Sequence, residues 1–188
     1  MSRITNQLIL REYAPSDVDA LFKIQGDRDY MQFTYWSASR QMCESWLQQY
    51  VEAELEVGFA PWTVVHRLDQ RIVGWGGLNI DPNAQNWGPE VSYFIDPAYQ
   101  GAGLATELVQ ASLHCGFRDL DLPAIGGFVR PGNLASIRVL TKCGFELVGY
   151  EPALERNHYA VRRDAADRAN QEAALPDELV YKFFSPRA

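Results

Sequence analysis

The stretch Gln100-Gly101-Ala102-Gly103-Leu104-Ala105 decides the fold class of this chain. It follows an alternating apolar run, Val91–Ile95, and precedes a proline-free run with helical character, residues 105–120. This order predicts a strand, a turn that contains glycine, and a helix. The first amides of a helix have no intrahelical acceptor, and glycine leaves room for an anion to approach them. Because the helix N-terminus also carries partial positive charge, we expect this turn to bind a phosphate or a pyrophosphate.

Two familiar phosphate loops do not fit the stretch. A Walker loop requires a lysine directly after its second glycine, and no Gly-Lys pair occurs in the sequence. A dinucleotide-binding fingerprint requires Gly-x-Gly-x-x-Gly or Ala, whereas the last position counted from Gly101 is Thr106. The pattern that remains is Gln-x-x-Gly-x-Ala.

A second segment, residues 133–145, predicts a capped helix that leads into a strand. Asn133 is a suitable N-cap residue, and Ile137 and Leu140 fall on one face of the helix. Gly144 follows the last turn, where a left-handed glycine commonly ends a helix. The segment therefore begins with asparagine and ends in Lys-x-Gly-Phe.

Together and in this order, the two segments resemble the signature motifs of the GNAT superfamily of N-acetyltransferases, and the resemblance covers roughly residues 7–150. It implies an α/β fold with a central mixed, mostly antiparallel sheet flanked by helices. It also implies acetyl-CoA as co-substrate. Within the superfamily, the chain is most similar to the branch that acetylates the N-termini of ribosomal proteins.

Periodicity and turn residues give an element order that agrees with this fold. We expect one domain, residues 1–188, in which residues 155–175 form a partly helical insertion before the last strand. This insertion is either a peripheral helix or a cover over the acceptor site. The expected strands are residues 7–13, 61–66, 71–78, 90–95, 124–129, 145–149 and 178–184, and the expected helices begin near residues 15, 40, 105 and 133.

The resemblance assigns the donor to backbone groups. The strand that contains Phe94 and Ile95 would pair with the pantetheine arm, and the Ile95 amide would donate to the thioester oxygen. Asn133 would hydrogen-bond the same arm. The pyrophosphate would lie on the segment formed by Gln100, Gly101, Ala102, Gly103, Leu104, Ala105 and Thr106.

Two residues are candidates for the chemistry. Glu90 begins the strand and could act as general base or anchor the ammonium group of the acceptor, or it could simply be an exposed residue at a strand start. Many family members have a tyrosine acid where this chain has Leu140. Ser136 on the same helix resembles the serine of the ribosomal-protein branch, although it could instead serve only the helix backbone.

The expected reaction is direct attack of a primary amine on the thioester. An α-amino terminus has a pKa of about 8 and lysine about 10.4, so a modest base favours a peptide N-terminus or small α-amine as acceptor. Acetylation of a small-molecule amine or antibiotic remains an alternative, as does a non-catalytic acyl-CoA sensor. An aromatic segment either lines the acceptor side or packs under a loop; it contains Tyr30, Phe33, Tyr35 and Trp36.

Composition narrows the setting. The net charge is −7 and no basic cluster occurs, so we expect no nucleic-acid partner. No apolar run reaches the length of a transmembrane helix and no secretory signal is visible, which favours a cytoplasmic protein without a membrane partner. Cys43, Cys115 and Cys143 are widely spaced, so we expect small buried side chains and no metal site. The oligomeric state stays open, with a homodimer as one alternative.

Overall fold

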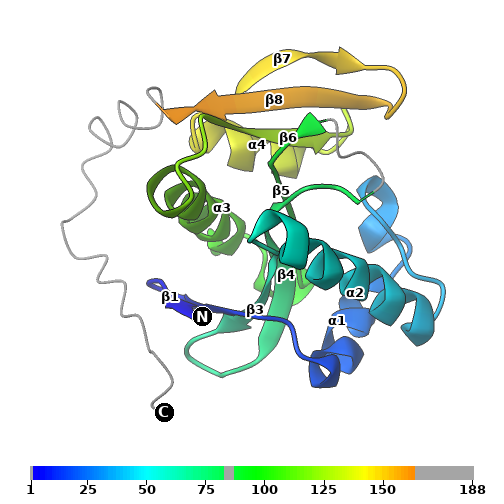
Figure 1. Cartoon of the computed structure of the whole chain (residues 1–188). Coiled ribbons are helices and arrows are strands. Elements are labelled where there is room, and N and C mark those ends of the chain that lie inside the picture. Colours follow the sequence, from blue (N-terminus) through cyan, green and yellow to red (C-terminus); the bar gives the residue numbers. More distant parts are fainter. Residues whose placement is uncertain (1, 83–86, 164–188) are drawn as a thin grey trace.

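The computed structural model describes residues 2–82 and 87–163 of the 188-residue chain. Within these residues, eight strands form one sheet in the order β1-β2-β3-β4-β5-β6-β8-β7 (Figure 1). Neighbouring strands are antiparallel except for β5 and β6, which are parallel. The strands are β1 (Arg3–Ile4), β2 (Leu8–Arg11), β3 (Trp62–His66), β4 (Ile72–Asn79), β5 (Glu90–Ile95), β6 (Ala124–Val129), β7 (Glu146–Glu151) and β8 (Arg156–Arg162).

Four α-helices flank the sheet: α1 (Val18–Gln25), α2 (Arg40–Val57), α3 (Leu104–His114) and α4 (Leu134–Lys142). Their ends follow from local sequence. The Ser39 hydroxyl and the Asn133 carboxamide accept hydrogen bonds from first-turn amides of α2 and α4. Gly58 and Gly144 take left-handed φ angles of 81° and 83° just beyond the two helices. No helix within the described residues is long and apolar enough to cross a membrane.

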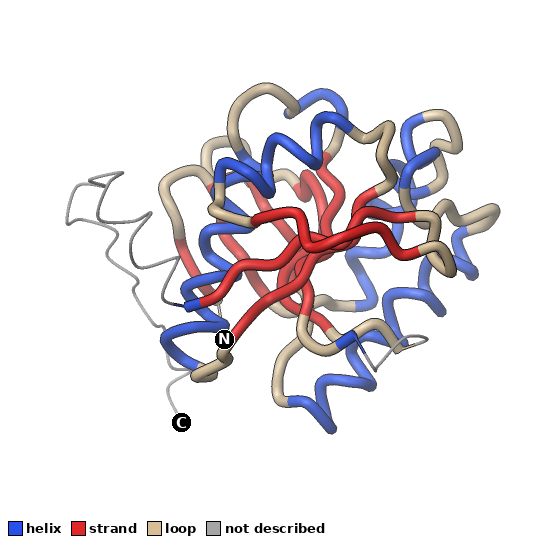
Figure 2. The backbone as a smooth tube through the Cα atoms, turned by 90° about the horizontal axis from the view of Figure 1, so that it is seen from above, coloured by secondary structure: helices blue, strands red, loops and turns tan. Residues whose placement is uncertain are grey.

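The helices lie on opposite faces of the sheet, as the view from above in Figure 2 shows. They bury two hydrophobic cores, one on each face. Strand β5 contributes to both because its side chains alternate. Val91 and Ile95 lie in the core under α3 and α4, whereas Phe94 packs with Trp75 in the core under α1 and α2. A strand fixed on both faces provides a rigid support for residues at its ends and edge.

The fold class and the expected elements that fall within the described residues are confirmed, with one correction. Residues 156–162, which we placed at the start of a helical insertion, form strand β8 in a tight hairpin with β7. Tyr159 and Val161 point into the core, while the other residues of β8, most of them polar, are less buried and hid the strand pattern. The remainder of the predicted insertion and the strand predicted at 178–184 lie outside the described residues.

Candidate active site

The predicted phosphate loop is an exposed turn in which both glycines are left-handed. Gly101 and Gly103 have φ angles of 78° and 83°, a region that only glycine occupies readily. No atom lies within 4 Å of the place where a Cβ would stand on either residue. The first helical hydrogen bond of α3 is donated by Glu107 to the Gly103 carbonyl, at 3.0 Å. The α3 amides before Glu107 therefore have no intrahelical acceptor and face the turn.

Side chains hold this turn in place from the β1–β2 connection. The Gln7 amide donates to the Glu107 carboxylate at 2.6 Å, and the Gln7 side chain donates to the same carboxylate at 3.0 Å. The Gln7 side chain also reaches the Ala102 carbonyl at 3.3 Å. Leu104 is buried in the core, so its side chain anchors the helix start. Leu104 and Ala105 can contribute to anion binding only through their amides, whereas Thr106 also carries a hydroxyl.

Strands β5 and β6 separate directly in front of the turn. Their parallel ladder contains the single pair Glu90–Gly126, with a hydrogen bond of 2.9 Å from the Gly126 amide to the Pro89 carbonyl. By contrast, β4 and β5 pair along the whole length of β5. The edge of β5 that faces β6 is therefore unpaired over the second half of the strand, where an extended molecule rich in amides could complete the ladder.

The register fixes which backbone groups face this gap. The Asp96 amide donates to the Val73 carbonyl at 2.7 Å. Because hydrogen-bonded and non-hydrogen-bonded pairs alternate in an antiparallel ladder, the preceding residue, Ile95, directs its amide away from β4, as does Tyr93. The Ile95 carbonyl accepts a hydrogen bond from the Tyr30 hydroxyl. The Ile95 amide thus faces the gap between β5 and β6.

Two predicted donor-binding residues are placed differently from the expectation. The backbone of Phe94 points the opposite way to that of Ile95 and pairs with Trp75 of β4. Its side chain is buried in the core under α1 and α2. The Gln100 side chain donates to the Tyr30 hydroxyl at 3.0 Å, so it braces the turn against β5. Tyr30, which joins Gln100 to Ile95, could be found only from the structure.

Glu90 is buried at the point where β5 and β6 part. Its side chain is 8% exposed, so the interpretation as an exposed strand residue is wrong. Burial raises the pKa of the carboxyl from its usual 4.5 to about 7, and the charge of Asp81 adds to the rise. A hydrogen bond from the Ser92 hydroxyl, 3.1 Å from Oε1, and the charge of Arg156 oppose it. The group therefore titrates near neutral pH, as a general base should.

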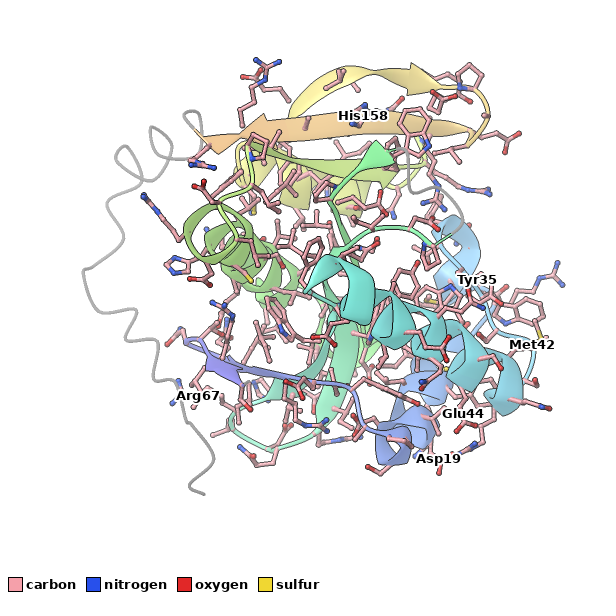
Figure 3. The ribbon with its side chains drawn as sticks, in the orientation of Figure 1. Asp19, Tyr35, Met42, Glu44, Arg67 and His158 are labelled. Atoms are coloured by element: carbon pink, nitrogen blue, oxygen red, sulfur yellow. The ribbon has the colours of Figure 1, made fainter. Side chains whose placement is uncertain are left out.

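A cavity of about 260 Å³ opens beside Glu90. The sequence predicted none of its other walls, which come from the loop before β5, from β6 and from the β7–β8 hairpin. Phe128 stacks on its cross-strand neighbour His158 at 4.6 Å, and Trp87 meets Phe128 edge-on at 5.2 Å (Figure 3 labels His158 on β8). The lining residues are Asp81, Trp87, Glu90, Phe128, Ala153, Leu154 and Arg156.

Ser136 lies in the first turn of α4, on the other face of β5. The Asn133 carboxamide oxygen accepts from the Ser136 amide at 3.1 Å, which confirms Asn133 as the cap. The Ser136 hydroxyl is 2.9 Å from the hydroxyl of Tyr93, whose pKa burial raises. Leu140 is 1% exposed and packs inward, so it offers no acid. The structure thus brings a tyrosine hydroxyl to Ser136 from β5, which the sequence analysis missed.

Most of the aromatic segment before α2 packs rather than lining the site. Tyr35 stacks on Trp46 at 5.2 Å, and the Trp36 indole donates to the Gly26 carbonyl at 2.9 Å. Figure 3 shows Tyr35 beside α2, away from His158. Only Tyr30 of this segment contacts the predicted site residues. Cys43, Cys115 and Cys143 are buried, as expected.

Comparison with known proteins agrees with this arrangement. A family profile described as "Acetyltransferase (GNAT) domain" matches residues 7–146, which is most of the chain. The chain belongs to the GNAT acetyltransferase family. An "Uncharacterized N-acetyltransferase p20" of Bacillus licheniformis is 29% identical over 162 residues, covering 81% of this chain and 88% of the relative. A "Probable N-acetyltransferase YjcK" of Bacillus subtilis is 33% identical over 102 residues, covering 54% and 55%.

Solved structures share the GNAT fold at low identity. An acetyltransferase from Agrobacterium tumefaciens superimposes with a TM-score of 0.74 at 19% identity, covering 87% of this chain and 95% of the other. RimL, a ribosomal L7/L12 alpha-N-protein acetyltransferase in complex with coenzyme A, gives 0.72 at 22%, covering 86% and 97%. An aminoglycoside acetyltransferase in complex with coenzyme A gives 0.71 at 19%, covering 86% and 98%.

Membership of the GNAT family confirms the predicted enzyme class, an N-acetyltransferase that uses acetyl-CoA as co-substrate. The same fold carries acetyltransferases named for a ribosomal protein and for aminoglycosides, so the fold alone does not select the acceptor. Among the described residues, no group of three or more His, Cys, Asp or Glu side chains is arranged to hold a metal ion.

Proposed function

We propose that this GNAT acetyltransferase moves an acetyl group to an α-amine, which reaches the thioester from the Glu90 side of β5. The observation that carries this proposal is a buried carboxyl, with a pKa of about 7, at the separation of β5 and β6. Acyl transfer to an amine requires a neutral nucleophile, a held donor and a stabilised oxyanion. Each requirement has a matching group on β5 or on the turn that follows it.

The donor would lie along the open edge of β5. Backbone groups of Tyr93 and Ile95 would pair with the pantetheine amides, and the Ile95 amide would donate to the thioester oxygen. The α3 amides after Gly103 would hold the pyrophosphate, with Gly101 and Gly103 allowing its approach. The amide nitrogen of Asn133, whose oxygen caps α4, would be left to contact the pantetheine arm.

Glu90 would accept the proton of the ammonium group. Transfer from an α-ammonium, with a pKa of about 8, to a carboxylate whose pKa is about 7 costs about 1.4 kcal/mol. The same transfer from lysine, with a pKa of about 10.4, costs about 4.6 kcal/mol. That difference is more than a hundredfold in the neutral amine, and it supports an α-amine over a lysine side chain.

The leaving sulfur would be protonated from the opposite face of β5. The amine nitrogen bonds to the thioester carbonyl carbon, the carbon–sulfur bond breaks, and the thiolate takes a proton. The Tyr93 hydroxyl, kept protonated by its raised pKa and 2.9 Å from the Ser136 hydroxyl, is the candidate donor, with Ser136 as relay. This pair would replace the acid that Leu140 cannot supply.

Release of coenzyme A thiol from acetyl-CoA tests the proposal against the two alternatives. We expect release with α-amines, including peptides with a free N-terminus, and its loss in Glu90→Gln with acetyl-CoA binding retained. A matched control is Glu146→Gln, which changes an exposed carboxylate on β7. Binding of acetyl-CoA without thiol release across peptides, amino acids, polyamines and aminoglycosides would instead support a sensor.

A further inference from the structure

The cavity beside Glu90 contains a cation that the proposed chemistry does not use. Arg156, the first residue of β8, lines the cavity together with the two carboxylates Asp81 and Glu90. Within the part of the chain that the structure describes, its guanidinium forms no hydrogen bond or ion pair, although it is half-buried. By contrast, Arg163, just beyond the other end of β8, is paired with Asp121 at 2.6 Å.

We propose that Arg156 binds a carboxylate of the acceptor, so that the preferred substrate is a zwitterion with an α-ammonium at Glu90 and an anionic group beside it. This inference rests on the proposed function of the same site. A guanidinium matches a carboxylate with two parallel hydrogen bonds, which are stronger than neutral ones. Because no hydrogen bond occupies its N–H groups within the described residues, the Arg156 guanidinium has donors available for a bound carboxylate.

The charges of the cavity argue against a polycation. Asp81 and Glu90 attract an ammonium group, but Arg156 repels any second positive charge in the same small space. An aminoglycoside presents several ammonium groups, whereas an α-amino acid or an acidic N-terminal residue presents one of each sign. The positive and negative groups in the walls therefore favour an acceptor that carries one ammonium group for the carboxylates and one anionic group for the arginine.

The size and the apolar wall of the cavity support the same class of acceptor, an amino acid or an N-terminal residue. Its volume of about 260 Å³ is below the ~300–1,000 Å³ typical of pockets for drug-sized ligands, so it suits one amino-acid-sized group. The rings of Trp87 and Phe128 line the cavity and form one aromatic cluster with His158, which stacks on Phe128. An apolar or aromatic side chain would pack there, with centroid separations of the usual 4.5–7 Å.

Paired acceptors, of which one member carries an anionic group and the other a neutral amide, test this inference. Phenylalanine is compared with phenylalaninamide, and the peptide Asp-Phe-amide with Asn-Phe-amide, by thiol release from saturating acetyl-CoA. We expect kcat/KM at least tenfold higher for the charged member of at least one pair. The pair that shows the preference distinguishes a free amino acid from an acidic peptide N-terminus. Equal or lower kcat/KM for the charged member of both pairs would overturn the inference.

Substitution of Arg156 provides the second test of this inference. Arg156→Gln should reduce the preference for the charged acceptor to within about threefold, and Arg156→Lys should retain part of it. The ratio is the readout because loss of Arg156 also changes the pKa of Glu90, which affects both acceptors alike. The control is Arg162→Gln at the other end of β8, roughly 20 Å away, which should keep the ratio. An unchanged ratio in Arg156→Gln would contradict the assignment.

A binding experiment distinguishes failure of the proposed function from failure of this inference. If no acceptor releases thiol, the same pairs are titrated by calorimetry into protein saturated with coenzyme A. Binding of the charged member that is lost in Arg156→Gln but kept in Arg162→Gln would support the carboxylate site without turnover. Absence of such binding would overturn the inference together with the enzyme assignment.

Discussion

Replacement of Glu90 by glutamine should remove activity and stabilise the protein above neutral pH. Moving the pKa of the carboxyl from its usual 4.5 to about 7 corresponds to about 3 kcal/mol in favour of the neutral form in the folded state. Glutamine resembles the neutral form in shape, and its amide oxygen can accept the hydrogen bond that the Ser92 hydroxyl donates at 3.1 Å. The variant should therefore keep the fold and avoid the cost of burying a charge.

The direction in which stability changes with pH follows from proton linkage. Because the folded pKa is raised, the wild-type protein has the full contribution of this group below about pH 4.5 and loses it as the pH rises through about 7. In Glu90→Gln, the free energy of unfolding does not fall with pH in this way, because glutamine has no proton to lose. The difference between variant and wild type should thus grow by about 3 kcal/mol between pH 4.5 and pH 8.

Urea unfolding at several pH values measures this difference, and thiol release measures activity on the same preparations. Wild-type kcat/KM should rise with pH through about 7 as the base ionises, while Glu90→Gln should be reduced at least hundredfold at pH 8. Glu146→Gln on β7 serves as control and should alter neither curve. Parallel stability curves for wild type and Glu90→Gln, or retained activity in the variant, would refute the reasoning.

Three further substitutions test other parts of the site. Gly103→Val should weaken acetyl-CoA binding at least tenfold by calorimetry, whereas Gly58→Val, with a similar φ but outside the site, should lose comparable stability and bind normally. Equal binding in both would contradict the loop assignment. Tyr93→Phe should lower kcat about tenfold to a hundredfold in steady-state assays without changing the acetyl-CoA dissociation constant, and an unchanged kcat would exclude it as the acid. Tyr30→Phe removes the hydroxyl that donates to the Ile95 carbonyl. It should lower the free energy of unfolding by about 1 kcal/mol and reduce kcat/KM. Wild-type values in both assays would show that this hydrogen bond is dispensable.

Local sequence patterns were sufficient for the elements that carry the donor. The cap at Asn133 and the left-handed turn at Gly103 depend on residues a few positions apart, so their signals are complete within one segment. The start and end of β5 follow from alternation and from Glu90 and Asp96-Pro97 at its limits. The same local logic failed at β8, where four polar residues, Arg156, Asn157, His158 and Arg162, outnumber the buried pair Tyr159 and Val161.

The acceptor side could not be predicted because it is assembled from distant segments. Phe128 and His158 meet only through the register of β6 with β8, and Arg156 reaches the cavity only because the β7–β8 hairpin is short. The contact between Tyr93 and Ser136 likewise depends on how α4 packs on β5. The burial that raises the pKa of Glu90 is also a property of the whole fold, and no neighbouring residue in the sequence indicates it.

The account depends most directly on the open edge of β5 and the turn at Gly101 and Gly103 as the seat of the donor. Calorimetric titration of the folded wild-type protein with acetyl-CoA measures this alone, without an acceptor. We predict saturable binding of one acetyl-CoA per chain that is weakened at least tenfold in Gly103→Val. Absence of saturable heat from protein whose circular dichroism shows the expected mixed α/β content would contradict the account.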